Sequence, residues 1–63
     1  MVRIEKQEYK NGFVIWTKVG EARTYAEAIR QYNGEQTWWQ KRDHCFEVVK
    51  NGIHTVYRMI KEG

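Results

Sequence analysis

Residues 24 to 34, TYAEAIRQYNG, decide the fold, because no other stretch of the chain combines a helical pattern with a signal at each end. Thr24 and Glu27 have the spacing of a capping box, in which each side chain bonds the backbone amide of the other. We expect Gly34 to end the helix in the left-handed conformation. One side of this helix is apolar and must pack on a sheet: Tyr25, Ala28, Ile29 and Tyr32.

An Asn-Gly pair on each side of the helix, Asn11-Gly12 and Asn51-Gly52, predicts a β-hairpin, because this dipeptide tolerates the two positive φ angles of a type I′ turn. The strands expected around the two pairs are residues 2 to 10, 13 to 19, 44 to 50 and 53 to 60. The chain therefore predicts an α+β fold of order β-β-α-β-β. Its four-stranded antiparallel sheet would carry one short helix on one face.

Strand alternation assigns the side chains to the two faces of this sheet, because a two-residue turn pairs Lys10 with Phe13 and Lys50 with Ile53. The face expected in the core holds Val2, Ile4, Phe13, Ile15, Val19, Phe46, Val48, Ile53, Thr55, Tyr57 and Met59. The opposite face would stay in water, with Tyr9, Trp16, Lys18 and Arg58 available to a partner. A register slip or a bulge would instead turn Trp16 into the core.

Residues 35 to 43, EQTWWQKRD, show no clean period, and we expect a loop that runs into the next strand. If this segment is extended, only one residue of the pair Trp38 and Trp39 can point to the core, and we favour Trp39 as the exposed one. With Lys41 and Arg42 it would form a patch that stacks bases and contacts phosphates. The alternative, which we favour, is a solvated loop whose tryptophan closes the open end of the core.

Size and composition limit the classes of protein that fit. The 63 residues suggest one small domain over 1 to 63, and the single cysteine excludes an internal disulfide. There is no apolar run for a membrane span and no signal-peptide pattern, so we expect a cytoplasmic protein. The net charge of +3 is mild, with both signs scattered along the chain, which is weak support for nucleic-acid binding.

His44, Cys45 and His54 are the only candidates for a metal site or a nucleophile with its base. In the expected register His44 points away from Cys45, and His54 lies beside Val49 at the other end of the strand pair. We therefore expect no metal, no cofactor and no enzymatic activity.

The stretch Arg23 to Ala28 is similar to the start of the helix in several small strand-helix domains, among them the arm-binding domains of phage integrases. Those domains place three strands before the helix, whereas two are expected here. A capping box alone produces the similarity, so no family is assigned.

These features leave three functional hypotheses. The first is a protein-binding regulator or inhibitor of the kind found in phages and mobile elements, acting through the open sheet face. The second is a nucleic-acid-binding domain that uses this face or the segment from Trp38 to Arg42, and the third is a homodimer or other self-associating domain. The mixed charges and aliphatic residues of the open face favour a protein partner. The candidate contact residues are Tyr9, Trp16, Lys18, Trp39, Lys41, Arg42 and Arg58.

Overall fold

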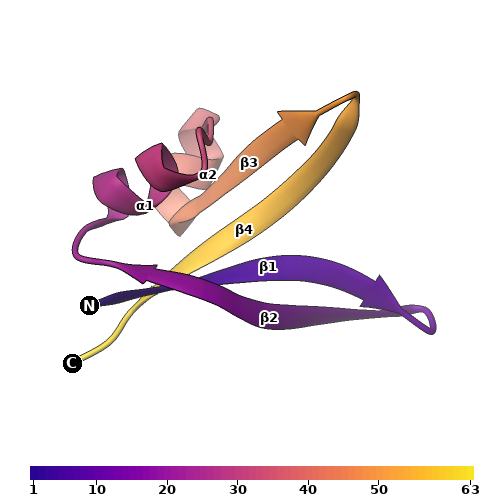
Figure 1. Ribbon diagram of the computed structural model, residues 1–63, viewed down its shortest axis with the longest axis horizontal. Coiled ribbons are helices and arrows are strands. Elements are labelled where there is room, and N and C mark those ends of the chain that lie inside the picture. The colour runs from indigo at the N-terminus through magenta and orange to yellow at the C-terminus, as the bar shows by residue number, and fades with distance from the viewer.

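The computed structural model describes residues 1–63, and its four strands form one antiparallel sheet, as predicted. The elements follow in the order β1 (Val2–Lys10), β2 (Phe13–Ala22), α1 (Tyr25–Gln31), α2 (Trp38–Asp43), β3 (Cys45–Lys50) and β4 (Ile53–Lys61). The strand order across the sheet is β2-β1-β4-β3, so the first and last strands lie in the middle (Figure 1). Neither helix is long and apolar enough to cross a membrane.

Both hairpins turn at their Asn-Gly pair. Asn11 and Gly12 have φ of 53° and 80°, and Asn51 and Gly52 have φ of 51° and 77°, as a type I′ turn requires. The second hairpin keeps the expected pairing along its whole length. The first keeps it from the turn as far as Glu5.

A bulge in β2 then changes the register of the first hairpin. Ile4 pairs with Gly20, not with Val19 as predicted. Val19, expected in the core, is 41% exposed. Gly20 gives Tyr32 of the helical segment room to approach, because a Cβ there would lie 2.8 Å from the tyrosine hydroxyl. This hydroxyl donates to the carbonyl of Val19 at 3.2 Å, which ties the bulge to the end of α1.

Helix α1 begins as predicted and ends differently. The Thr24 hydroxyl accepts from the amide of Glu27 at 3.1 Å, although the reverse bond of the box is not formed. Asn33, with φ of 53°, adopts the left-handed conformation that we expected of Gly34. Gly34 is needed for space, since a Cβ there would lie 2.3 Å from Cδ2 of Phe46.

The prediction of a loop over residues 35 to 43 is wrong, because Trp38–Asp43 form the second helix. Its start is a complete capping box. The Thr37 hydroxyl accepts from the amide of Gln40 at 3.3 Å, and the Gln40 side chain accepts from the amide of Thr37 at 2.9 Å. His44 ends the helix in the left-handed conformation, with φ of 58°.

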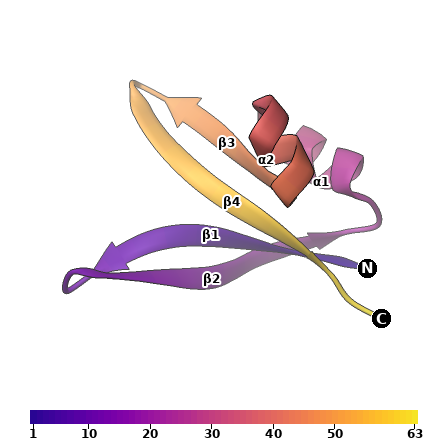
Figure 2. The ribbon, with the colours of Figure 1, turned by 180° about the vertical axis from the view of Figure 1, so that it is seen from behind.

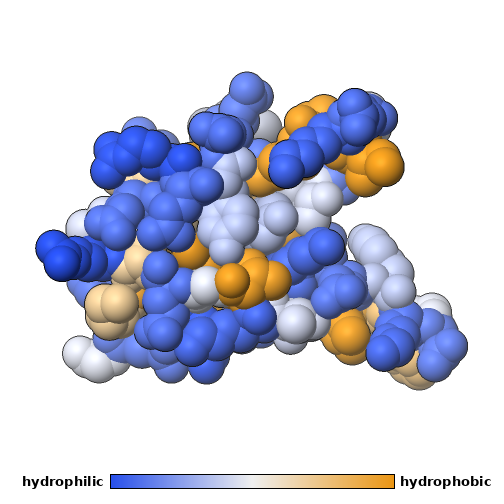
Figure 3. Space-filling view, in the orientation of Figure 1, coloured by the Kyte–Doolittle hydropathy of each residue, from blue (hydrophilic) through white to orange (hydrophobic).

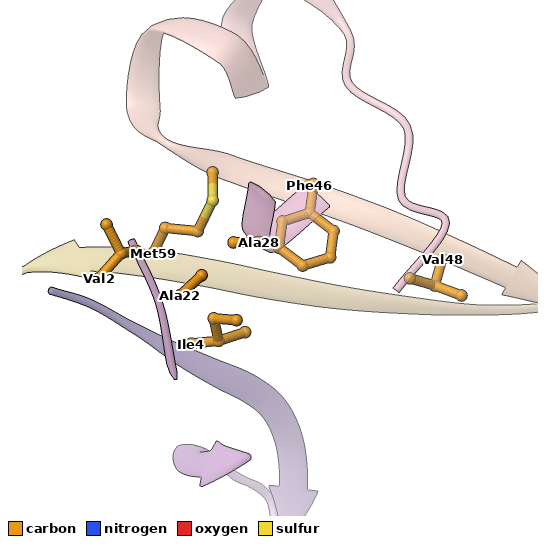
Figure 4. Close-up of a cluster of buried hydrophobic side chains, with 7 residues drawn as sticks. All are labelled: Val2, Ile4, Ala22, Ala28, Phe46, Val48 and Met59. Atoms are coloured by element: carbon orange, nitrogen blue, oxygen red, sulfur yellow. The ribbon is translucent and has the colours of Figure 1, made fainter. Parts of the chain in front are cut away.

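The core lies where the helices cover the sheet (Figure 4). Ala28 of α1 is fully buried, and the rest of the predicted apolar side of this helix packs around it. The seven buried apolar residues come from all four strands and α1: Val2, Ile4, Ala22, Ala28, Phe46, Val48 and Met59. The helices and both chain ends lie at one end of the sheet, and both turns lie at the other (Figures 1 and 2).

The two hairpins part beyond this core. β1 pairs with β4 only from Val2 to Lys6, so residues 7 to 16 form a two-stranded first arm that pairs only with itself. Residues 47 to 56 form a second arm on the other side of the gap. Figure 2 shows both arms pointing away from the helices.

The first arm overturns part of the expected core. Phe13 is 72% exposed and Ile15 is 38% exposed, although both stand on the face that carries the core. On the second arm Ile53, also expected in the core, is 69% exposed. Alternation assigned these side chains to the correct face, but the helices are too short to cover the arms.

Candidate functional site

The open face, which is the side of the sheet away from α1, holds a network of charges centred on Glu5. This carboxylate is 8% exposed and lies on the central strand β1. One of its oxygens accepts from Nε of Arg58 at 2.6 Å, and the other lies 3.1 Å from Nε of Arg3. Arg3 also pairs with Glu62 at 3.3 Å. Arg58 in turn lies over the ring of Trp16, 4.4 Å from its centroid.

This network fixes Trp16 and Arg58 in place. A guanidinium that is held by a carboxylate and lies on an indole ring gains from both contacts. Because the bulge at Val19 lies beyond Trp16, the indole keeps the open face that we predicted for it, where it is half-buried. Lys18 stands on the same face opposite Glu5.

The first arm is the most apolar exposed part of the molecule. On the open face, Tyr9 is 75% exposed and its partner Val14 is 47% exposed. The opposite face of the same two strands carries Phe13 and Ile15. The arm thus presents aromatic or aliphatic side chains on both of its faces. A two-stranded hairpin alone has little stability in water.

The other predicted contact residues lie apart from this group, on α2. This helix adjoins α1, since the rings of Tyr25 and His44 stack with their centroids 4.2 Å apart. Trp38 is 76% exposed and Trp39 is 45% exposed, so the tryptophan we favoured is the less exposed of the two. Arg42 lies 5.4 Å from the centroid of the Trp38 ring.

The structure therefore divides the predicted contact residues into two groups. Those of the sheet are Tyr9, Trp16, Lys18 and Arg58, and those of α2 are Trp39, Lys41 and Arg42. The ion pairs of Lys18 with Glu21 at 3.2 Å and of Arg42 with Asp43 at 3.1 Å offset part of the charge in each group.

The metal-binding residue types do not come together. His54 pairs with Val49 and Cys45 with Arg58, as the register predicted, and no three side chains of these types form a cluster. Burial raises the pKa of the Cys45 thiol, the nearby charge of Asp43 raises it further, and Arg58 acts in the opposite direction. A thiol with a raised pKa is a poor nucleophile at neutral pH.

One surface cleft was not predicted from the sequence. It lies beside the second arm, has a volume of about 570 Å³, and includes Lys6 and Lys50 among its lining residues. Figure 3 shows the surface notched between the two arms, with apolar patches on both sides. Ile53, the apolar residue after the second Asn-Gly turn, lines this cleft, whereas we had assigned it to the core.

The arrangement offers binding surfaces, in the form of an apolar arm, a fixed tryptophan-arginine pair and a lysine-lined cleft. Comparison of the chain with protein-family models, curated proteins and solved structures gave no match.

Proposed function

We propose that the chain is a small non-enzymatic binding module for a protein partner, with the first arm as its main contact. The observation that carries this proposal is the exposure of apolar side chains on both faces of residues 7 to 16. Exposed aromatic and aliphatic residues grouped in this way are typical of the centre of a protein interface. A module of this kind acts by occupying a surface of its partner, that is, as a regulator or inhibitor.

The charges around the arm support a protein partner over a nucleic acid. Arg58 and Arg3 share the carboxylate of Glu5, and Lys18 is paired with Glu21. A surface that bound phosphates would instead leave its cations free for them. The base of the arm is also rigid, because Trp16 is held beneath Arg58. A rigid anchor lowers the entropy lost when the arm binds.

Site-specific photo-cross-linking tests this proposal. Tyr9 or Phe13 is replaced by p-benzoylphenylalanine, and the protein is irradiated in a nuclease-treated cell lysate. Arg30, which is exposed on α1 away from the arm, takes the same substitution as the control. We expect one discrete protein adduct from both arm positions and none from the control position.

A second substitution shows whether the adduct depends on the apolar surface. Val14→Asp places a charge beside Tyr9 without touching the core, and we expect it to lower the yield by at least about tenfold. Amide spectra of each variant verify that the fold is retained. The same adducts from the arm and from Arg30, or a yield unchanged by Val14→Asp, would contradict the proposal.

Nucleic-acid binding at α2 is the second candidate, favoured by one observation. Trp38 is 76% exposed, with Arg42 near its ring and Lys41 in the same turn of the helix. An exposed indole next to two cations suits base stacking with phosphate contact. We expect oligothymidylate to quench tryptophan fluorescence in a salt-dependent way, with the quenching lost in Trp38→Ala and kept in Trp16→Ala. No quenching at low salt would reject this candidate.

Self-association is the third candidate, and the sheet edges favour β2 as its site. β3 is covered at Glu47, which exchanges two backbone hydrogen bonds of 2.9 Å with Glu35. β2 forms the other edge and has no such cover. Unpaired edge strands tend to pair with another chain. Sedimentation at two concentrations separates this candidate from the others, since a monomer at both concentrations removes it.

A further inference from the structure

The cleft beside the second arm is lined by three parts of the chain. β4 and β3 supply one wall, the end of α1 supplies another, and Lys6 of the central strand β1 completes it. The lining residues include Lys6, Lys50, Ile53 and Tyr57, and the volume is about 570 Å³. A cleft of this size lies within the range of ligand sites in proteins.

The charge of this cleft has one sign. Its lining includes two lysines and no aspartate or glutamate. Neither Lys6 nor Lys50 takes part in an ion pair, in contrast to the arginines of the open face. The nearest carboxylate along the same face of β1 is that of Glu8, which does not line the cleft. The cleft is therefore complementary to an anionic ligand.

The end of α1 does not cancel this charge. A helix ends in free carbonyls that repel anions, but two of these carbonyls are occupied here. Asn33 donates to the carbonyl of Arg30 at 3.2 Å, and Gly34 donates to that of Ile29 at 2.8 Å. Of the two side-chain amides at this end, that of Gln31 donates to the carbonyl of Glu21 at 3.5 Å, and that of Asn33 makes no hydrogen bond within the protein.

The apolar lining suits a peptide better than a nucleobase. The rings of Tyr32 and Tyr57 pack against each other and against Phe46, with centroids 5.0 to 6.0 Å apart. The apolar side chain that remains exposed on this face is aliphatic, namely that of Ile53 at 69%. Recognition of single-stranded nucleic acid relies on exposed aromatic rings, whereas aliphatic side chains pack readily against those of a peptide.

We propose that this cleft binds an acidic peptide segment of the protein partner, with Lys6 and Lys50 contacting carboxylates and Ile53 contacting an apolar side chain between them. The inference rests on the proposed function and adds the chemistry of the partner. It assigns a site that is separate from the contact of the first arm, so the two sites would hold one partner at two places.

Titration with synthetic peptides tests the cleft without the natural partner. The probe is a blocked hexapeptide of alternating glutamate and valine, and the control peptide has lysine in place of glutamate. A six-nucleotide oligothymidylate and inorganic phosphate are the other probes. Amide and methyl chemical shifts of the intact protein report the site of binding. We expect only the acidic peptide to shift Ile53, Thr55 and Lys50, with weaker binding as salt is added.

A pair of variants with equal net charge separates a site from general attraction. Lys6→Gln/Lys50→Gln removes both cations of the cleft, and we expect binding about tenfold weaker. Arg23→Gln/Lys61→Gln removes two exposed, unpaired cations that lie outside both the cleft and the first arm, and it should leave the affinity unchanged. Lys50→Gln alone, at an exposed position, covers the case in which the double variant fails to fold.

Three results would overturn the inference. They are no shifts at the lining residues with the acidic peptide, equal weakening by the two double variants, and binding of oligothymidylate or phosphate in its place. If the cleft fails while cross-links from Tyr9 persist, the protein-binding proposal stands and only the cleft is excluded. If the cross-links are also absent, both proposals fail.

Discussion

The two hairpins share a turn sequence, Lys-Asn-Gly followed by an apolar residue, yet their apolar side chains have opposite surroundings. Each hairpin has one phenylalanine on the face that carries the core. Phe46 of the second hairpin is fully buried, whereas Phe13 of the first is 72% exposed. Strand alternation predicted correctly on which face of the sheet each side chain lies. Whether a side chain on that face is buried depends on whether a helix or loop covers it.

The covering of the second hairpin explains the difference. α1 places Ala28 among the core residues with Phe46, and Glu35 pairs with the outer edge of β3. The first hairpin meets α1 only near the open ends of its strands, where Ile4 and Ala22 share the core cluster of Ala28. Beyond Lys6 this hairpin leaves the sheet. The first arm is thus a projection, and the second is a wall of the core. The proposed binding function follows from this difference.

Truncating the two phenylalanines should give the largest contrast. Phe46→Ala opens a cavity in the core and should lower the free energy of unfolding by about 3 to 5 kcal/mol, while Phe13→Ala should change it by less than about 0.5 kcal/mol. Denaturant unfolding measures both. If Phe46→Ala does not fold, Phe46→Leu should lower the free energy of unfolding by a smaller amount, which can be compared with the change in Phe13→Ala. Equal losses at the two positions would mean that the first arm is part of the core.

The close approach of Gly34 to Phe46 sharpens the same comparison. Gly34→Ala places a Cβ 2.3 Å from the ring, so the ring must shift, and we expect a loss of about 1 to 3 kcal/mol. Combining it with Phe46→Leu should recover part of this loss, because the smaller side chain leaves room. If the losses of unfolding free energy are additive in the double variant, the two residues are not in contact.

Removing the cap of α2 should have a moderate effect. Thr37→Ala removes one bond of the capping box and should lower the free energy of unfolding by about 1 kcal/mol, measured by denaturant unfolding. Thr37→Ser keeps the hydroxyl and should be close to neutral. Thr24→Ala at the start of α1 gives the matched value for a cap with a single bond. An unchanged stability in Thr37→Ala would argue against the second helix.

The smallest effect concerns the pKa of Cys45 in the second hairpin. Burial raises this pKa first and Asp43 second, so the native thiol should stay protonated to higher pH than the thiol of the unfolded chain. Because the folded-state pKa is the higher one, the thiol contributes stability below the unfolded pKa. This contribution is lost as the pH rises through the folded pKa.

Alkylation by iodoacetamide as a function of pH measures this shift. The native rate profile should lie at higher pH than the profile in denaturant, and Asp43→Asn should move it part of the way back. Coincident native and denatured profiles would show that Cys45 is not protected by the fold.

Local signals in the sequence predicted much of this fold. The two Asn-Gly turns, the pairing of the second hairpin and the Thr24 cap all appear as expected. Helix α2 was also readable, since Thr37 and Gln40 have capping-box spacing, but the adjacent tryptophans hid the helical pattern.

The remaining differences depend on contacts between distant parts of the chain. The bulge at Val19 accompanies the approach of Tyr32 to Gly20, which no pattern within β2 indicates. The exposure of Phe13 depends on how far β1 stays paired with β4. The cleft at Lys6 and Lys50 depends on the same parting of the hairpins, so its residues could not be grouped from the sequence.

Amide hydrogen exchange tests the contrast between the hairpins most directly. Ile15 and Thr55 are matched positions, since their partners Glu8 and Val48 stand equally far from the two Asn-Gly turns. We predict that the amide of Ile15 exchanges at least about tenfold faster than that of Thr55, because the first arm opens without unfolding the core. Equal protection of the two amides would contradict this account, because the first arm would then belong to the same cooperative unit as the second.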